Sequence, residues 1–283
     1  MTYGLTGATV RFGHVTALDD VTLPVPAGLV TAVVGGDGAG KSTLLRAMVG
    51  EVVLDSGTVD APPAQEIGYL PASAGSWLDL TVQQNVDFVG GTYGLRGDAL
   101  RSRADPLLQR AGLADVRDRL SSQLSGGMRR KLGFVLAMLP DPRLLVLDEP
   151  STGVDPVSRV DLWRLVSEAA AHGAAVLMST TYLDEAERCA SILVLNGGHT
   201  LLEGSPATVR AAVDGTIVAT REPVRPEYAW RRGRVFHEWW PASGGTAEQQ
   251  GSAVVPDLED VVIASSLRRH PSDTAPGAAE VAP

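Results

Sequence analysis

The chain has very little of three features that often reveal where a protein works. It contains one cysteine, Cys189, so no disulfide forms within it, and we expect a packed core thiol rather than a reactive one. No apolar run approaches the roughly 18 residues that cross a bilayer, and no basic and then apolar leader opens the sequence. We therefore expect a cytoplasmic protein that is not secreted and that reaches a membrane through a partner.

Positive charge is also in deficit. Lys and Arg number 24 against 33 Asp and Glu, which gives a formal net charge of -9 at pH 7. Such a surface disfavours nucleic-acid backbones, so we expect no nucleic-acid partner. Apolar residues make up 44% of the 283 residues, enough to bury the core of one large domain with a small appendage.

A glycine-rich loop is the first feature that carries chemistry. It lies between an expected strand at 30–34 and an expected helix at 41–49, and it has the form GxxxxGK[ST]. The backbone amides of such a loop wrap phosphate beside the positive end of the helix, Lys41 neutralises the phosphates, and Ser42 offers its hydroxyl to Mg²⁺. The expected nucleotide-binding residues of this glycine loop are Gly35, Gly36, Asp37, Gly38, Ala39, Gly40, Lys41, Ser42 and Thr43.

A wholly apolar strand at 144–147 ends in two acidic residues, Asp148 and Glu149, followed by Pro150. A strand end delivers its carboxylates to the mouth of the sheet, where open α/β sheets bind ligands. We expect Asp148 to hold Mg²⁺ through water. A solvated acidic pair is the alternative interpretation.

The third motif is the run Leu124-Ser125-Gly126-Gly127-Met128 at the start of a helix expected over 126–139. Two glycines expose backbone amides beside a helix N-terminus, and the serine hydroxyl donates, so this serine–glycine turn is a second anion site. An N-capping serine with a flexible turn is the simpler alternative. The first anion site of the chain does not need this second one.

In this order and spacing the three motifs resemble the ATP-binding cassette (ABC) ATPases. The resemblance covers residues 1–214 and implies ATP and Mg²⁺ as ligands. It implies a dimer in which the turn formed by Ser125, Gly126 and Gly127 of one subunit caps the ATP held by the other. It also implies an α/β fold with a RecA-like parallel-sheet core, an antiparallel β-subdomain, an α-helical signature subdomain and a small C-terminal extension.

The resemblance assigns roles to three further residues. Glu149 matches the carboxylate that polarises the attacking water. Asp155, within the run 151–156, matches a loop that bridges the two sites of the dimer. Phe12 matches an aromatic residue that stacks on adenine, although a single Phe on a strand is as often a core residue.

Two positions depart from the family pattern. Relatives usually carry glutamine where this chain has Ala72, and Gln83 and Gln84 lie too far along to replace it. Relatives also carry a histidine at the γ-phosphate where this chain has Thr181, which donates one hydrogen bond but no positive charge. Losing such a contact costs on the order of 3 kcal/mol in the transition state, or about a hundredfold in rate.

These departures leave two hypotheses open for the catalytic residues. One is a slow or ATP-retaining site in this chain, paired with a competent site in a different subunit. The other is a homodimer that tolerates Thr181 in place of the histidine.

The composition changes near residue 214. We expect the ABC ATPase domain over 1–214, a small α+β extension over 215–267 and a disordered tail over 268–283. The expected strands are 8–12, 21–25, 30–34, 67–70, 144–147, 174–178, 192–195, 199–203 and 235–240. The expected helices are 41–49, 82–94, 99–111, 126–139, 157–171, 183–189 and 257–263.

Several segments look most like the drug- and antibiotic-export branch of ABC transporters, namely 148–156, 184–188 and, more briefly, 256–263. An amphipathic surface helix is the alternative for the last segment. Membership of this branch implies a separate transmembrane permease subunit and a second ABC ATPase subunit, which together place the chain on the inner face of the cell membrane.

By the same resemblance, residues 72–94 form the surface on which the permease docks. Trp77, Leu78 and Leu80 are apolar candidates for that contact, and they could equally be core.

Two other functions stay open. One is a non-transport ABC ATPase, which the single cassette, the acidic charge and the lack of a heptad run disfavour. The other is a regulatory subunit that binds nucleotide without hydrolysing it. Ala72 and Thr181 favour this second alternative, and Glu149 argues against it.

Overall fold

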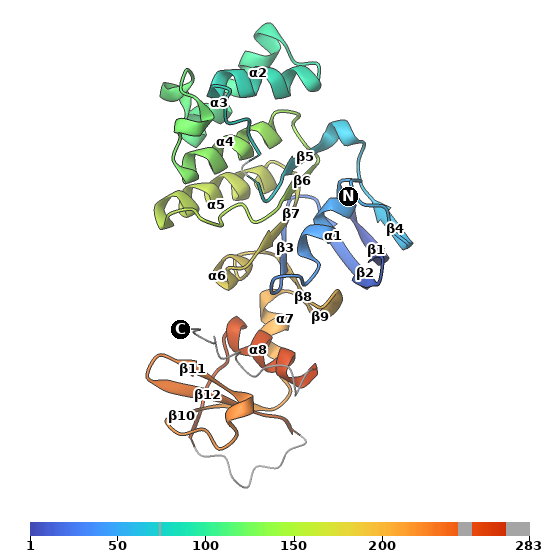
Figure 1. Cartoon of the computed structure of the whole chain (residues 1–283), viewed down its shortest axis with the longest axis vertical. Helices are drawn as coiled ribbons and strands as arrows, with labels where there is room; N and C mark the ends of the chain where they lie inside the picture. The colour runs from blue at the N-terminus through green and yellow to red at the C-terminus, as the bar shows by residue number, and fades with distance from the viewer. Residues whose placement is uncertain (74, 243–250, 270–283) are drawn as a thin grey trace, which may run out of the picture. The chain divides into compact units, whose positions relative to one another are not determined.

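The computed structural model describes residues 1–73, 75–242 and 251–269. The chain divides into two compact units, residues 1–200 and 201–283, whose elements are labelled in Figure 1. The expected domain boundary near residue 214 stays a prediction. Most of the tail expected over 268–283 lies outside the described residues, from residue 270 onward.

A six-stranded sheet in the order β5-β6-β7-β3-β8-β9 forms the centre of the first unit. Its strands are β3 (Val30–Val34), β5 (Ile67–Leu70), β6 (Leu144–Leu147), β7 (Ala175–Thr180), β8 (Ser191–Asn196) and β9 (His199–Gly204). The strands β5, β6, β7, β3 and β8 run parallel, and Val34 lies opposite Thr180 while Leu147 lies opposite Met178. The residues that follow β3, β6 and β7 therefore meet at one edge of the sheet.

An antiparallel sheet in the order β2-β1-β4 adjoins the helix α1 (Lys41–Met48). Its strands are β1 (Thr2–Phe12), β2 (Val15–Pro26) and β4 (Ser56–Asp60). One buried cluster joins this sheet, α1 and the central sheet, and it includes Leu5, Leu23, Leu44 and Leu177. The sequence analysis missed β4, because its residues are polar or exposed and carry no apolar alternation.

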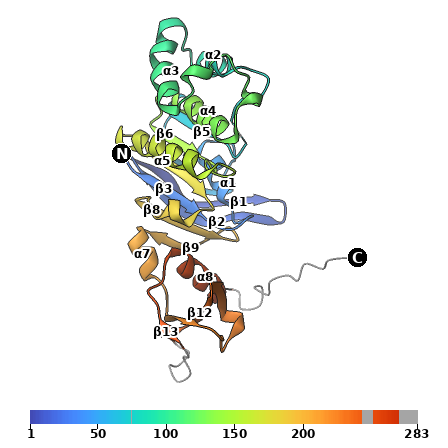
Figure 2. The same cartoon turned by 90° about the vertical axis from the view of Figure 1, so that its left-hand side faces the viewer.

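Four helices form the α-helical part of the first unit, as Figures 1 and 2 show. They are α2 (Val82–Thr92), α3 (Gly97–Ala111), α4 (Gly126–Met138) and α5 (Pro156–Ala171). Helix α3 packs against α4 and α5, and α2 packs against α4. Strand β5 lies close to α4, since a Cβ atom on Gly68 would come within 2.2 Å of the carbonyl oxygen of Ala137.

The second unit contains a four-stranded antiparallel sheet in the order β11-β12-β10-β13. Its elements are α7 (Pro206–Ala211), β10 (Thr216–Thr220), β11 (Ala229–Arg232), β12 (Val235–Trp240), β13 (Ser252–Ala253) and α8 (Leu258–Arg269). Ile217 and Trp239 of the sheet pack against Ala264 and Leu267 of α8 in a small buried cluster. The helix expected at 257–263 is therefore present and extends further.

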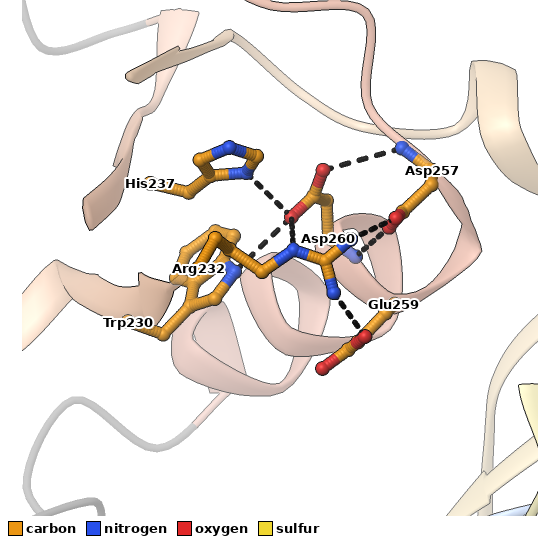
Figure 3. A network of polar contacts seen from close by, with 6 residues as sticks. All are labelled: Trp230, Arg232, His237, Asp257, Glu259 and Asp260. Carbon is orange, nitrogen blue, oxygen red and sulfur yellow. Dashed lines mark hydrogen bonds and ion pairs between the residues drawn. The ribbon is translucent and has the colours of Figure 1, made fainter. Parts of the chain in front are cut away.

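A polar network joins the sheet of the second unit to the first turn of α8 (Figure 3). Asp260 is 1% exposed, and its Oδ1 accepts a hydrogen bond from Trp230 Nε1 at 3.1 Å. The same oxygen lies 2.8 Å from Nδ1 of His237, and Arg232 pairs with Asp257, the residue before α8. The network therefore satisfies a carboxylate that is buried beneath two strands.

Helix α6 (Leu183–Ala186) is shorter than the helix expected at 183–189. Cys189 consequently lies outside it but is buried, and its Sγ is 3.5 Å from the carbonyl oxygen of Glu185. Among the described residues, none of the helices combines the length and the apolar character that a membrane crossing requires.

Candidate nucleotide-binding site

The glycine loop connects β3 to α1 in a conformation that glycine adopts without strain. Gly38 and Gly40 have φ values of 74° and 105°. A Cβ atom on Gly40 would lie 2.4 Å from the carbonyl oxygen of Ala17, and one on Gly35 would lie 2.4 Å from that of Leu195. The loop therefore lies against neighbouring backbone at both ends, and a side chain at either position would displace it.

Lys41, the first residue of α1, directs its ammonium group into the glycine loop. The side chain is 6% exposed, and Nζ donates hydrogen bonds to the carbonyl oxygens of Gly35 at 2.8 Å and Gly36 at 3.1 Å. The same nitrogen lies 3.6 Å from Oε1 of Glu149. The ammonium group of Lys41 therefore lies between the glycine loop and the end of β6. An anionic group bound by the loop would contact this positive charge.

A cavity of about 390 Å³ opens over the glycine loop. Its lining includes Asp37, Lys41, Ser42, Thr43 and Glu149. These residues come from the glycine loop, the first turn of α1 and the end of β6. The structure thus brings seven of the nine expected glycine-loop residues and the expected catalytic carboxylate to a single concave site. This site lies beside a helix N-terminus, which is where phosphate groups bind.

Asp148 and Glu149 are held at the end of β6 by a hydroxyl group from the neighbouring strand. Ser179 Oγ donates to Asp148 Oδ1 at 2.6 Å, and the backbone N–H of Glu149 donates to the same Oγ at 2.8 Å. The N–H of Asp148 donates to the carbonyl oxygen of Leu70 at 2.8 Å. Ser179 is fully buried, so this hydroxyl fixes both acidic residues.

The backbone of Glu149 is in the left-handed region, with φ 47°. A non-glycine residue pays a strain energy there, on the order of 1–3 kcal/mol, and such strain concentrates at functional sites. Thr152 Oγ1 donates to Glu149 Oε2 at 3.1 Å, which orients the carboxylate.

The oxygen donors in and next to the cavity fit Mg²⁺, since Ser42 lines it and Asp148 directly precedes Glu149, which also lines it. The described residues contain no cluster of three or more His, Cys, Asp and Glu side chains of the kind that encloses a metal ion. Mg²⁺ needs no such cluster in nucleotide sites, because it takes one or two protein oxygens together with substrate phosphates. The Ser42 hydroxyl and the Asp148 carboxylate, held by Ser179, are oxygen donors of that kind.

Five of the expected residues of this site are not in the cavity lining, namely Gly35, Gly36, Asp148, Phe12 and Thr181. Phe12 is 53% exposed at the end of β1, so it is not a core residue, and it pairs with Val15, which does line the cavity. Thr181 is exposed and follows Thr180, the residue opposite Val34 at the start of the glycine loop. Both positions are compatible with contact to a nucleotide at this edge of the sheet.

The serine–glycine turn begins α4, where Ser125 Oγ accepts a hydrogen bond from the N–H of Met128 at 3.2 Å. The turn lies against the start of α5, because a Cβ atom on Gly127 would come within 2.6 Å of Ser158 Oγ. Asp155 caps α5, and the hydrogen bonds from the backbone and side chain of Ser158, then that from the Val157 N–H, lower the pKa of its carboxyl group.

The serine–glycine turn and Asp155 thus form a second cluster. None of its residues lines the cavity over the glycine loop. Within the described residues, no hydrogen bond or ion pair joins the turn to that loop.

A buried carboxylate missed by the sequence analysis connects the segment after Glu149, the end of β7 and helix α5. Glu185 is 4% exposed, and its Oε2 accepts hydrogen bonds from Ser151 Oγ at 2.8 Å and Thr180 Oγ1 at 2.7 Å. Arg159 Nε donates to Oε1 at 3.2 Å. Glu185 thereby ties the segment after Glu149 to the end of β7. The sequence contains this residue in the run 184–188, but no spacing rule indicates its partners.

The structure also shows what surrounds Ala72. Gln83 accepts a hydrogen bond from Arg117, and Gln84 completes the N-cap of α2 with Thr81, so both glutamines have other partners. The backbone around Ala72 instead receives hydrogen bonds from Arg130 of α4, a residue to which the sequence analysis gave no role.

An apolar cavity of about 530 Å³ lies beside this segment, and its lining includes Tyr69, Trp77, Leu78 and Tyr93. Trp77 and Leu78 are 47% and 48% exposed, so neither is a core residue. Burial, followed by the charge of Asp148, raises the pKa of Tyr69 to about 12, which keeps its hydroxyl neutral.

The chain is similar to known proteins over most of its length. The family model described as "ABC transporter" matches residues 18–152. The "Daunorubicin resistance ATP-binding protein DrrA3" of Streptomyces coeruleorubidus is 36% identical over 220 residues, which are 74% of this chain and 70% of that protein. The "Probable multidrug ABC transporter ATP-binding protein YbhF" of Escherichia coli (strain K12) is 39% identical over 209 residues, 70% of this chain. That match spans 36% of YbhF, so this chain corresponds to about a third of it.

Among solved structures, one described as "Structure of ATP binding subunit of ABC transporter" superposes with a TM-score of 0.68 and 28% identity. The match covers 75% of this chain and 92% of that chain. These findings confirm the expected fold class and the expected likeness to the drug-export branch.

Proposed function

Because the chain belongs to the ABC transporter family, we propose that it is an ATP-binding subunit that hydrolyses Mg-ATP to drive export through a separate membrane protein. The observation that carries this proposal is the cavity over the glycine loop, where Lys41, Ser42 and Glu149 converge. A fixed cation, a metal-binding hydroxyl and a carboxylate around one cavity suit phosphoryl transfer to water.

Each residue has a distinct role in this chemistry. Lys41 binds the β- and γ-phosphates, and Ser42 and Asp148 hold Mg²⁺, which supplies charge neutralisation when bound. Glu149 orients and polarises the attacking water, and Thr152 holds its carboxylate in place. The family pattern adds Phe12 as the residue that stacks on adenine.

A second cassette completes the site in this proposal. Ser125, Gly126 and Gly127 form an anion-binding turn that does not line the chain's own cavity, and Asp155 lies beside it. The turn therefore serves a nucleotide held by a partner subunit. The partner is either a second copy or a different ABC ATPase with a competent site, since Ala72 and Thr181 leave this chain without two polar contacts.

The membrane partner in this proposal is a permease that docks on the apolar cavity. Trp77 and Leu78 expose apolar surface there, and Trp77 stacks edge-on against Phe88 at 4.5 Å between ring centroids. Exposed apolar surface around a cavity suits an inserted helix of a partner. The chain would then be peripheral on the inner face of the cell membrane. The names of its relatives make hydrophobic drugs or antibiotics the proposed cargo.

One alternative is a regulatory subunit that binds ATP without hydrolysing it. Ala72 and Thr181 favour it. The strained backbone of Glu149 and the two hydroxyl groups that hold it and Asp148 weigh against it, because a binding subunit has no need of an oriented carboxylate.

Nucleotide binding by Lys41 variants tests the proposal. Lys41→Ala should weaken Mg-ATP binding about tenfold or more, because charge-assisted hydrogen bonds to phosphate contribute on the order of 1.5–3 kcal/mol. Lys131→Ala is the matched control, since that lysine pairs with Asp161 away from the glycine loop. Failure of the unmodified chain to bind Mg-ATP in calorimetry, or equal binding by Lys41→Ala, would refute the proposal.

A further inference from the structure

Arg130, in the second turn of α4, meets three successive backbone carbonyl groups. Its Nη1 donates to the oxygens of Pro71 at 3.1 Å and Ser73 at 2.8 Å, and its Nη2 donates to the oxygen of Ala72 at 2.5 Å. A guanidinium group presents its donors in a rigid planar fork, whereas a lysine ammonium is a compact point charge. The three bonds therefore fix the orientation of residues 71–73 against α4, as well as their distance from it.

The held segment, residues 71–73, starts at the end of β5, next to the strand end that carries Asp148 and Glu149. Leu70 accepts the hydrogen bond from the N–H of Asp148, and residue 71 follows directly. Burial lowers the pKa of Arg130, while the charges of Glu149 and Asp148 raise it. The guanidinium group therefore lies in the field of both carboxylates, and a change of charge around them alters the forces on it.

The same segment forms part of the wall of the apolar cavity. Pro71 and Ser73 line this cavity together with Trp77 and Leu78. Gly133, one turn after Arg130 on α4, lines it as well. A shift of residues 71–73 relative to α4 thus changes the shape of the surface on which we propose that the permease docks.

We propose that Arg130 is a positioning residue that links the nucleotide cavity to the apolar cavity through the backbone of residues 71–73. This inference rests on the proposed function, in which ATP binds beside Glu149 and a permease binds at Trp77. Ala72 has no polar side chain that could connect the two cavities. In this chain Arg130 of α4 makes the connection, through the backbone carbonyl groups of residues 71–73. Helix α4 also begins with the serine–glycine turn. Binding of a partner's nucleotide to this turn would therefore affect the helix that carries Arg130.

Hydrogen–deuterium exchange of the amides at 72–80 tests this inference, measured with and without Mg-ATP. In the unmodified chain we expect ATP to change the exchange rate of this segment. In Arg130→Met these amides should exchange roughly tenfold faster, because bonds between a charged group and three carbonyls are lost, and the response to ATP should disappear. The affinity for ATP should stay within about twofold, since Arg130 does not line the nucleotide cavity.

The variant Arg130→Lys distinguishes an effect of the guanidinium geometry from an effect of the positive charge alone. It keeps the positive charge near Glu149 but not the fork geometry, so we expect the ATP response to be lost here too. Arg129→Met is the matched control, because within the described residues the Arg129 side chain makes no hydrogen bond or ion pair. It should behave like the unmodified chain. Thermal unfolding of each variant shows whether the fold is kept, and Arg130→Lys serves if Arg130→Met does not fold.

Two results would overturn the inference. One is unchanged exchange and an unchanged ATP response in Arg130→Met. The other is a full ATP response in Arg130→Lys, which would assign the effect to charge alone. Failure of the proposed function looks different: the unmodified chain would not bind ATP, while the faster exchange of 72–80 in Arg130→Met would persist without nucleotide.

Discussion

Ser179 shows how much of the site depends on one buried hydroxyl group. It donates to Asp148 and accepts from the Glu149 backbone, so a single atom fixes the expected metal ligand and the expected catalytic residue. Ser179→Ala would leave two buried polar groups without their partner. Such a loss costs on the order of 1–3 kcal/mol of the free energy of unfolding.

The functional consequence of Ser179→Ala should appear in the metal dependence of binding. Because Asp148 would lose its orientation, we expect the affinity for ATP to fall about tenfold with Mg²⁺ and to stay unchanged in EDTA. Calorimetric titrations under both conditions measure this. Ser122→Ala, an exposed serine, is the control. An equal loss of affinity with and without Mg²⁺ would contradict a role through the metal.

Cys189 permits a prediction about reactivity. Burial, followed by the charge of Glu185, raises the pKa of its thiol to about 12. A raised pKa disfavours the thiolate, so at pH 8 about one thiol in ten thousand is ionised. Iodoacetamide should therefore leave Cys189 unmodified in the folded chain and label it after denaturation in urea. Labelling of the folded chain at the rate of a free thiol would show that the residue is not enclosed.

At the residue scale, the sequence predicts groups that belong to a spaced motif. Lys41, Ser42 and Glu149 converge on one cavity as their motifs indicate. Ser179 and Arg130 were not predicted, because their roles arise from partners far along the chain, and no spacing rule connects residue 130 to residues 71–73.

At the scale of elements, strong local patterns predict structure well. β3, β5 and β6 follow their predictions to the residue, because mostly apolar runs are buried in a parallel sheet whose two faces are covered. β4 was missed, since its run Ser56–Asp60 is exposed throughout and pairs with β1 through its backbone. The helix at 183–189 was predicted too long, because α6 ends at Ala186.

The polar network of Figure 3 leads to a prediction about helix α8. Asp260→Asn keeps the shape but removes the charge that faces the donors of Trp230 and His237. We expect the second unit to lose on the order of 2 kcal/mol of stability. Urea unfolding followed by tryptophan fluorescence measures this, since Trp230 and Trp239 lie in that unit.

Glu259→Gln is the comparison for that experiment. Its carboxylate is 50% exposed and pairs with Arg232 at the surface, so its loss should cost well under 1 kcal/mol. If both substitutions lower the free energy of unfolding equally, the buried carboxylate of Asp260 does not stabilise α8 more than an exposed one.

At the scale of the whole molecule, the proposed function gives the chain two half-sites rather than one complete site. The glycine loop with Lys41 and Glu149 forms one, and the serine–glycine turn with Asp155 forms the other. Each needs a complement from a second cassette in the proposed function. Since the chain has Ala72 and Thr181 where relatives usually carry glutamine and histidine, our account favours a partner with a competent site.

Mg-ATP turnover by the purified chain, compared with Glu149→Gln, tests this account most directly. We predict that the chain alone binds Mg-ATP but hydrolyses it no faster than Glu149→Gln, and that a competent second cassette restores hydrolysis. Turnover by the chain alone that clearly exceeds that of Glu149→Gln would contradict the account and would establish a self-sufficient homodimer in its place.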